Sequence, residues 1–171
     1  TQVVSRIRST LGVELPLEDV PIVQKLIIEK ARRHAKPVIV ATQMLDSMIS
    51  APRPTRAEAS DVANAVLDGA DAVMLSGETS IGQFPIQTVR IMARIVESTE
   101  DHGLPRMAAF TWEPKTTTGI VCRAASHVAE AVEADLMIAF TTTGDSARRM
   151  ARYRSSIPVL AFTPQVLVRN Q

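Results

Sequence analysis

The amino-acid sequence predicts an α/β protein with parallel strands, and two observations support this class. Two short apolar runs, 38–41 and 72–75, are each followed at once by hydroxyl, amide and carboxylate side chains. The segment between them carries apolar residues at helical spacing, which is typical of a strand–helix–strand unit. In parallel sheets and barrels, ligands bind at the carboxyl ends of the strands. We therefore expect a functional site where these two runs end.

The composition excludes several functional classes. The chain has 171 residues, 46% of them hydrophobic and 4% aromatic, and a net charge of +1. A charge so close to zero argues against nucleic-acid binding through long-range electrostatics. Cys122 is the single cysteine, so no internal disulfide can form. No apolar run reaches the roughly 20 residues of a membrane span, and the start lacks a signal-peptide pattern, so we expect a cytoplasmic protein without membrane partners.

Helices and strands alternate along the first half. Residues 17–34 have apolar side chains at spacings of three and four, which predicts a helix. The apolar run 38–41 predicts a strand covered on both faces. Thr55 and Glu58 then fit a capping box, which gives Glu58 a structural role at the start of the next helix. Gly69 is a suitable left-handed residue for the end of that helix.

A second α/β segment follows a break in the pattern. The stretch 99–117 has proline, glycine and no sustained period, which indicates a domain boundary. On either side we expect helices at 85–97, 118–133 and 145–153 and strands at 72–75, 136–140 and 158–162. The helix 85–97 should bury Ile86, Val89, Met92, Ala93 and Val96. The helix 118–133 should bury Val121, Ala124, Ala125, Val128 and Val132.

Four ungapped stretches around the first two strands carry a specific resemblance. They read ATQMLDSM at 41–48, PRPTRAE at 52–58, SDVANAVLDGAD at 60–71 and LSGET at 75–79. They closely resemble the pyruvate kinase family in its bacterial form, and the match runs from about Gly12 to about Arg169.

Members of this family are several times longer than this chain. The resemblance implies an incomplete (β/α)8 (TIM) barrel segment at 1–99 and a linker at 100–117. A truncated C-terminal α/β domain with a parallel sheet, which binds effectors, would follow at 118–171.

The resemblance also implies an activity and a catalytic site. Pyruvate kinases transfer a phosphoryl group from phosphoenolpyruvate to ADP in glycolysis, giving pyruvate and ATP. In the family the residue matching Thr42 lies beside the reacting carbon and belongs to the hydroxyl and water network that protonates the enol. Ser76 would support Thr42. Gly12, Glu78 and Thr79 would lie near the substrate or the nucleotide.

The loop after residue 140 resembles the site where the family binds phosphorylated effectors. Thr141, Thr143, Gly144 and Ser146 carry over as candidate phosphate-binding residues, because hydroxyls and free helix amides suit a phosphate. Asp145 adds a negative charge that should weaken anion binding. The alternative is that these residues only cap the start of the following helix and bind no ligand.

The first twelve residues leave three interpretations open. The family's metal-binding aspartate falls at Thr10, and a neutral hydroxyl is a poor ligand for Mg²⁺. The segment is a divergent stretch, a join between the family's first barrel strand and its later part, or a stretch with residues missing.

The resemblance implies Mg²⁺ and K⁺ as cofactors, although their ligands have no matching positions here, so we expect no metal ligands and no activity from this chain alone. The implied partners are phosphoenolpyruvate, ADP or ATP, a phosphorylated effector and further copies in a homo-oligomer, a tetramer in the family. The alternative is a degenerate, non-catalytic paralogue that binds phosphate ligands or serves assembly.

Overall fold

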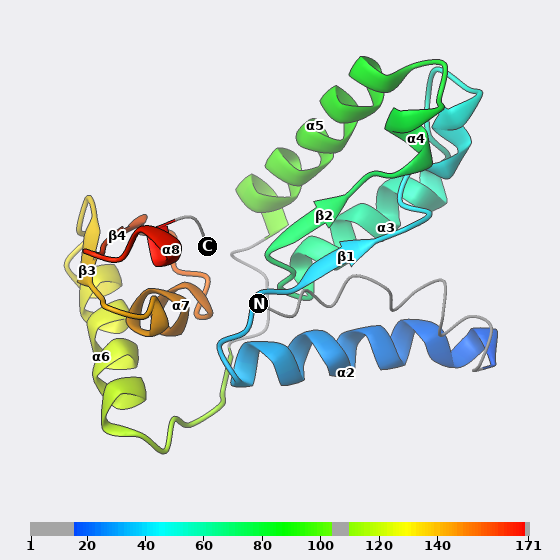
Figure 1. Ribbon diagram of the computed structural model, residues 1–171. Helices are drawn as coiled ribbons and strands as arrows, with labels where there is room; N and C mark the ends of the chain where they lie inside the picture. Colours follow the sequence, from blue (N-terminus) through cyan, green and yellow to red (C-terminus); the bar gives the residue numbers. More distant parts are fainter. Residues whose placement is uncertain (1–15, 104–109, 170–171) are drawn as a thin grey trace. The chain divides into compact units, whose positions relative to one another are not determined.

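The computed structural model describes residues 16–103 and 110–169 (Figure 1). These residues form two compact units. The first holds the described residues up to Arg32 and from Pro37 to Gly103, and the second holds Arg33–Lys36 and the residues from Phe110 onward. Each unit contains one pair of parallel strands with helices. Within the described residues, no helix combines the length and the apolar character needed to cross a membrane.

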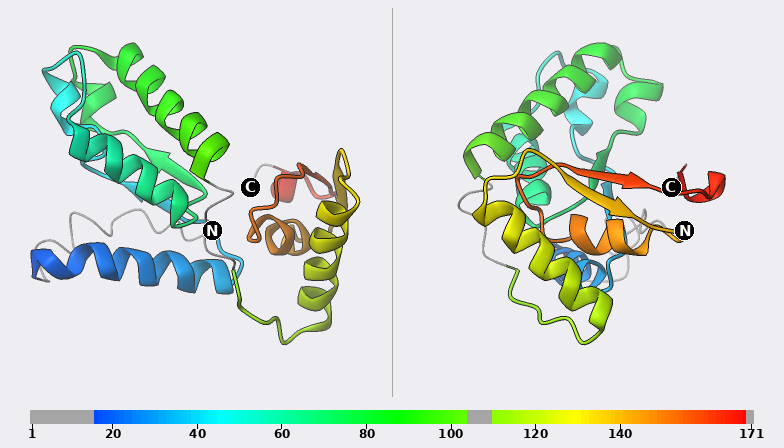
Figure 2. Two further views of the ribbon diagram at one scale, coloured as in Figure 1. Left: turned by 180° about the vertical axis from the view of Figure 1, so that it is seen from behind. Right: turned by 90° about the vertical axis from the view of Figure 1, so that its left-hand side faces the viewer.

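The first unit follows the predicted alternation of helices and strands. In chain order its elements are η1 (Leu17–Asp19), α2 (Val20–Arg33), β1 (Ile39–Ala41), η2 (Asp46–Ile49), α3 (Arg56–Leu67), β2 (Ala72–Met74), α4 (Gly77–Ser80) and α5 (Pro85–Gly103). Strands β1 and β2 pair in parallel, and Ala41 lies opposite Met74. Helix α3 packs against β2 and α5, while α2 lies on the β1 side (Figures 1 and 2).

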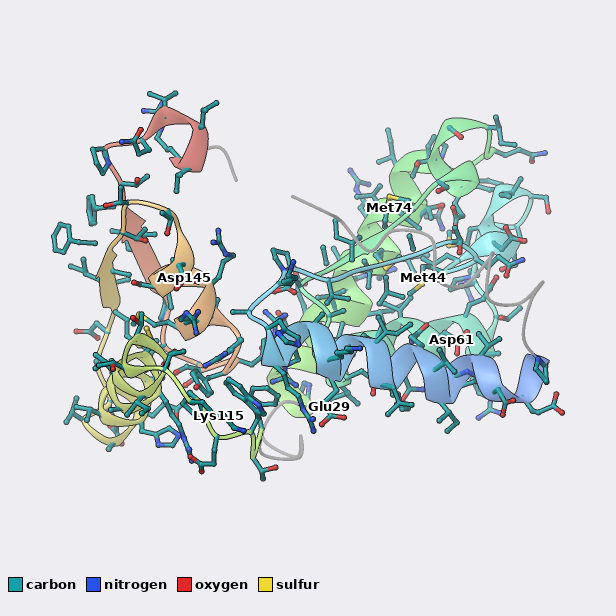
Figure 3. The ribbon with its side chains drawn as sticks, turned by 60° about the horizontal axis from the view of Figure 1, so that its bottom comes forward. Glu29, Met44, Asp61, Met74, Lys115 and Asp145 are labelled. Atoms are coloured by element: carbon teal, nitrogen blue, oxygen red, sulfur yellow. The ribbon has the colours of Figure 1, made fainter. Side chains whose placement is uncertain are left out.

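The core of the first unit forms between these strands and helices. Figure 3 shows Met44 inside the unit, among the crowded side chains around β1. The fully buried side chains of this core, each with at most 1% of its surface exposed, are Ile28, Val38, Met44, Leu45, Met48, Val62 and Ala65. The loop that follows β1 therefore contributes core residues directly after its polar ones, which fixes its path.

Two local signals place α3 as the sequence predicted. The Thr55 side chain accepts a hydrogen bond from the Glu58 amide, and Glu58 reaches back to the Thr55 amide, so the capping box is confirmed. Beyond the helix, Gly69 has φ +94°. A β-carbon on Gly69 would lie 2.7 Å from Nη1 of Arg32, so both the backbone angle and the close approach of Arg32 require glycine.

The second unit is a smaller α/β segment. Its elements are α6 (Thr117–Ala131), β3 (Met137–Phe140), α7 (Asp145–Ala151), β4 (Val159–Phe162) and α8 (Val166–Arg169). Strands β3 and β4 pair in parallel in register from Met137 opposite Val159 to Phe140 opposite Phe162. Helix α7 packs against both strands and against α6. The buried core consists of Cys122, Ala129, Met137, Ala139 and Met150.

The predicted inward face of α6 is wrong. Val121, Val128 and Val132 are 59%, 60% and 66% exposed. The helix instead buries Gly119, Cys122, Ser126 and Ala129. These small side chains also recur at helical spacing and let α7 approach closely. The Ser126 hydroxyl donates to the Cys122 carbonyl at 3.0 Å, so its polar group is satisfied in the core.

Helix α5 differs from its prediction in length and in face. It continues to Gly103, so the stretch 100–103 is helical rather than part of a loop. Ile86 and Val89 are 69% and 52% exposed. The predicted burial of Met92 is confirmed, and Thr88 and Ile91 are buried in place of Ile86 and Val89. A threonine can lie there because its hydroxyl donates to the Phe84 carbonyl at 2.9 Å.

Candidate functional site

The structure brings the ends of β1 and β2 together at one edge of the first sheet. Thr42 follows β1 directly, and Ser76 follows β2 after Leu75. Because the strands are parallel neighbours with Ala41 opposite Met74, both polar loops begin at the same edge. We name this edge, residues 42–47 and 75–79, the first rim. It is the location that the sequence predicted for a functional site.

The backbone at Thr42 is strained. Thr42 has φ +74° and Gln43 has φ +51°. The left-handed region costs roughly 1–2 kcal/mol for an ordinary residue, and it is least expected for a β-branched one. The Thr42 hydroxyl donates to the Ala41 carbonyl at 2.5 Å and is half-buried. The strained residue is thus the one to which the family resemblance gives a role in proton transfer.

Glu78 is a buried carboxylate of the first rim. It lies in the first turn of α4 and is 2% exposed. One carboxylate oxygen accepts from the Leu45 amide at 3.2 Å and the other from the Ser76 amide at 2.8 Å. The carboxylate therefore joins the loop after β1 to the loop after β2. Sequence reasoning placed Glu78 near the nucleotide, and it missed this bridge between the two loops.

The remaining candidates of the first rim have less defined positions. Thr79 is half-buried, and its hydroxyl donates to the Ser76 carbonyl at 3.2 Å, so it supports the same turn. Ser76 itself is exposed. Gly12, and Thr10 at the family's metal position, lie outside the described residues.

Glu58 connects the start of α3 to the turn η2. Its carboxylate accepts from the amide and the hydroxyl of Ser47, at 2.7 and 2.5 Å, besides its bonds to Thr55. Burial alone would raise the pKa of Glu58, but the hydrogen bonds from Ser47 and Thr55 outweigh it and lower the pKa from its usual value. The capping motif predicted the bonds to Thr55. It carried no signal for Ser47, which lies eleven positions away.

The described residues do not fit a metal site. In residues 16–103 and 110–169, no group of three or more histidine, cysteine, aspartate or glutamate side chains could hold a metal ion. Both carboxylate oxygens of Glu78, the buried acid of the first rim, already accept backbone amides. We therefore derive no step through Mg²⁺ or K⁺ from this part of the chain.

The loop after β3, residues 141–146, forms a second rim in the second unit. Thr141 donates its amide to the Phe162 carbonyl at 2.9 Å. Gly144 precedes α7 with φ +77° and provides no side-chain cap. Asp145, whose charge should weaken anion binding, accepts from Nε of Arg149 at 2.6 Å. The negative charge at this loop is therefore partly balanced by a cation on the same helix.

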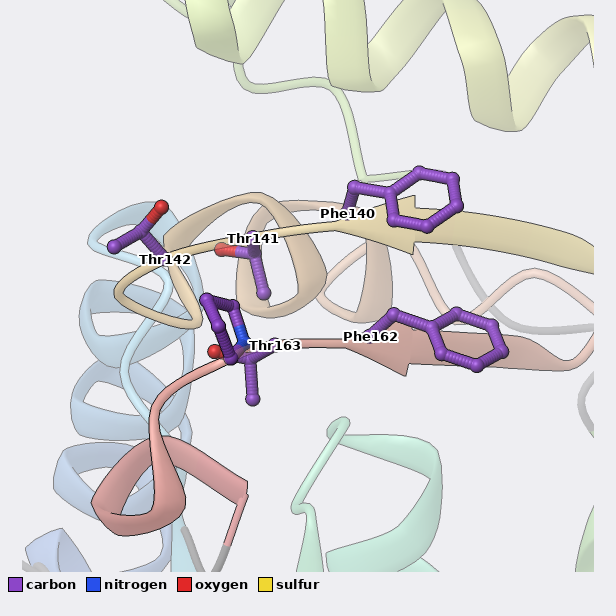
Figure 4. Close-up of a pocket in the computed structure, with 6 residues that line it drawn as sticks. Phe140, Thr141, Thr142, Phe162 and Thr163 are labelled. Carbon is purple, nitrogen blue, oxygen red and sulfur yellow. The ribbon is translucent and has the colours of Figure 1, made fainter.

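A shallow pocket of about 350 Å³ opens beside the second rim (Figure 4). Its lining consists of Phe140, Thr141, Thr142, Phe162, Thr163 and Pro164. The rings of Phe140 and Phe162 lie side by side, with centroids 5.6 Å apart and an angle of 26° between their planes. The pocket therefore has an aromatic end on the strands and a hydroxyl end in the loops.

The fold and the first rim together define an α/β protein whose polar groups gather at the carboxyl ends of parallel strands. Comparison with models of known protein families then identifies the family of this chain. The model of the pyruvate kinase barrel domain matches residues 1–89, and that of the pyruvate kinase alpha/beta domain matches residues 120–171. The chain belongs to the pyruvate kinase family.

Individual relatives agree with this assignment. The chain is 59% identical to the pyruvate kinase of Corynebacterium efficiens and 57% identical to that of Mycobacterium intracellulare, each over 164 residues. Both matches cover 96% of this chain and 34% of the relative. A crystal structure of a pyruvate kinase from Cryptosporidium parvum matches with a TM-score of 0.84 at 40% identity, over 96% of this chain and 35% of that one. The chain thus spans about a third of the length of the relatives it matches.

Proposed function

We propose that this chain supplies the later part of the catalytic barrel and the beginning of the effector domain of a pyruvate kinase. The complete protein would transfer a phosphoryl group from phosphoenolpyruvate to ADP, in the cytoplasm and as a homo-oligomer. The observation that carries the proposal is the strained Thr42, which lies within a family-matching stretch and at the same strand edge as Ser76. Backbone strain that the surrounding structure maintains is a feature of active sites.

The reaction consists of phosphoryl transfer followed by protonation of the enolate, and the residues of this chain bear on the protonation. Phosphoryl transfer depends on positioning and on cations that neutralise developing charge. The described residues hold no cluster for such cations. After the transfer, the enolate of pyruvate must take a proton at its methylene carbon. We assign Thr42 to the hydroxyl network that holds this proton near the carbon, and Ser76 to the support of that network.

A graft tests the proposal directly. Residues 12–169 of this chain would replace the matching segment of a complete pyruvate kinase, and pyruvate formation from phosphoenolpyruvate and ADP would be measured. We expect the graft to turn over and the isolated 171-residue chain to form no pyruvate. In the graft, Thr42→Val should lower turnover about a hundredfold, since positioned proton transfer contributes that much or more.

The matched control is Thr118→Val, an exposed threonine on α6, which should leave turnover unchanged. A soluble, folded graft without activity would contradict the proposed function. Turnover by the isolated chain would contradict only the expectation that its cation-binding part is essential.

We also propose that the second rim binds a phosphorylated effector through Thr141, Thr143, Gly144 and Ser146. The left-handed Gly144 and the balanced charge of Asp145 support this assignment. Titration of the isotope-labelled chain with a sugar bisphosphate, followed by amide chemical shifts, measures the binding. Shifts confined to 141–146 would support the proposal, and their absence up to millimolar concentration would contradict it.

A further inference from the structure

The first rim contains one charged group that is almost fully removed from water, the carboxylate of Glu78. It is 2% exposed, whereas Ser76, two positions earlier, is exposed to solvent. A buried carboxylate is costly unless hydrogen bonds satisfy it. Here both oxygens accept backbone amides, one from Leu45 in the loop after β1 and one from Ser76 in the loop after β2. The burial of this charge is therefore linked to the relative placement of the two loops.

One of the two bonds holds a residue of the proposed catalytic network, and the other holds the loop that carries Thr42. The Leu45 amide lies just beyond the left-handed pair Thr42 and Gln43. The side chains of Met44 and Leu45 are both 0% exposed, so the loop is anchored immediately after the strained pair. The other bond holds the amide of Ser76 itself. A strained conformation persists only when surrounding contacts maintain it, and these contacts meet that requirement.

We propose that Glu78 is a positioning residue: its carboxylate clamps the loop after β1 to the loop after β2, and so keeps Thr42 in its left-handed conformation beside Ser76. This inference rests on the proposed function, which makes Thr42 and Ser76 catalytic. Glu78 acts through these two residues and not on the substrate. Its two oxygens face amide hydrogens, and each accepts one hydrogen bond.

Hydrogen exchange tests the clamp without any variant and without activity. Ser76 is exposed and follows the end of β2, so its amide would exchange rapidly without the bond to Glu78. We expect the amides of Ser76 and Leu45 to exchange at least about tenfold more slowly than unbonded loop amides, since hydrogen bonds to charged groups are the strong ones. Free exchange of the Ser76 amide in the unmodified chain would overturn the proposal.

Glu78→Gln tests the clamp by removing the negative charge and one of the two acceptor oxygens at nearly unchanged side-chain size. Glutamine keeps one carbonyl oxygen and places an amide group against the other backbone N–H. We expect at least about tenfold faster exchange at Leu45 or Ser76, with unchanged exchange at Val40 and Val73 in the paired strands. Equal loss of protection at all four amides would mean that Glu78 serves overall stability alone, and would overturn the positioning role. The matched control is Glu97→Gln on α5, an exposed glutamate.

Activity in the complete grafted enzyme separates positioning from stability. Loss of the clamp should lower kcat about tenfold or more, because small misplacements of catalytic groups are costly, and should change KM for phosphoenolpyruvate less than about threefold. Deuterium uptake from D₂O into the methyl group of pyruvate reports protonation separately from phosphoryl transfer, and it should fall in parallel with kcat. Unchanged kcat and deuterium uptake in Glu78→Gln would overturn the positioning role.

If the unmodified graft is inactive, the proposed function fails, while the exchange of the Ser76 amide still decides whether the clamp exists. The two failures are therefore distinguishable.

Discussion

Thr42 and Gly144 have nearly the same positive φ in two different units. Both lie in the loop that follows the first strand of a parallel pair, with φ of +74° and +77°. Position 144 is a glycine, which adopts a positive φ without strain. At Thr42 a β-branched residue adopts it at a cost of roughly 1–2 kcal/mol. A similar φ is thus relaxed in the second unit and strained in the first.

The difference indicates whether each loop requires a side chain at its residue of positive φ. If only the turn were required at position 42, glycine would supply it without strain. A threonine held there points to a need for its hydroxyl, which is the direction of inference that an observed backbone outlier allows. The loop at Gly144 offers its amides and the neighbouring hydroxyls, and needs no side chain at the turn itself.

The two loops also differ in how they are anchored. The first rim is fixed by Met44 and Leu45, which are fully buried, and by the buried carboxylate of Glu78. The second rim has no fully buried side chain, and one of its bonds, from Nη2 of Arg148 to the Thr143 carbonyl at 3.2 Å, is exposed. We therefore expect substitutions to disturb the first unit more than the second.

The largest effect should come from removing a buried anchor. Leu45→Ala should lower the unfolding free energy of the first unit by about 2–5 kcal/mol, because it leaves a cavity in the core. The two units need not unfold together, so denaturant unfolding should be followed by hydrogen exchange for β1 and β2. The fluorescence of Trp112, the single tryptophan, reports the second unit.

The matched control is Leu167→Ala, at a residue that is 83% exposed, with an expected change within about 0.5 kcal/mol. Similar losses from both substitutions would contradict the contrast between a buried anchor and an exposed side chain.

A smaller effect should come from exchanging the residues at the two turns. Thr42→Gly should raise the unfolding free energy of the first unit by about 1 kcal/mol, because it removes the left-handed strain. Gly144→Ala should lower that of the second unit by about 1 kcal/mol for the opposite reason. The added β-carbon at position 144 would also meet Nη1 of Arg148 at 2.8 Å, a flexible group that can move. Destabilisation by Thr42→Gly would show that its side chain serves stability rather than function.

The smallest of the three effects concerns the start of α3. Glu58→Gln should cost about 0.5 kcal/mol at neutral pH, because the carboxylate caps the helix and holds Ser47. Hydrogen bonds lower the pKa of Glu58 in the folded state, so its contribution is present above the unfolded pKa and is lost as the pH falls through the folded one. The stability difference between the two proteins should therefore shrink in acid.

Helix α6 provides the comparison for this third change. Its cap Thr116 accepts from the Gly119 amide at 3.2 Å, and glycine stands where α3 has Glu58. Glu130→Gln, at an exposed residue of α6, is the matched control and should alter neither stability nor its pH dependence. A pH-independent difference for Glu58→Gln would contradict the role of its charge.

The sequence by itself determined the features that depend on near neighbours. Apolar spacing gave the order of helices and strands, Thr55 and Glu58 gave the capping box, and Gly69 gave the left-handed residue after α3. The polar groups after the two apolar runs also gave the location of the first rim, since the edge of a parallel sheet follows from strand direction.

Only the tertiary structure decided the features that depend on packing between distant segments. It selected the buried face of α6, because that helix is apolar on two sides and spacing alone cannot choose between them. It paired Glu78 with Leu45 and Glu58 with Ser47. It also revealed the strain at Thr42, because a backbone angle held against its intrinsic preference depends on contacts that no local pattern encodes.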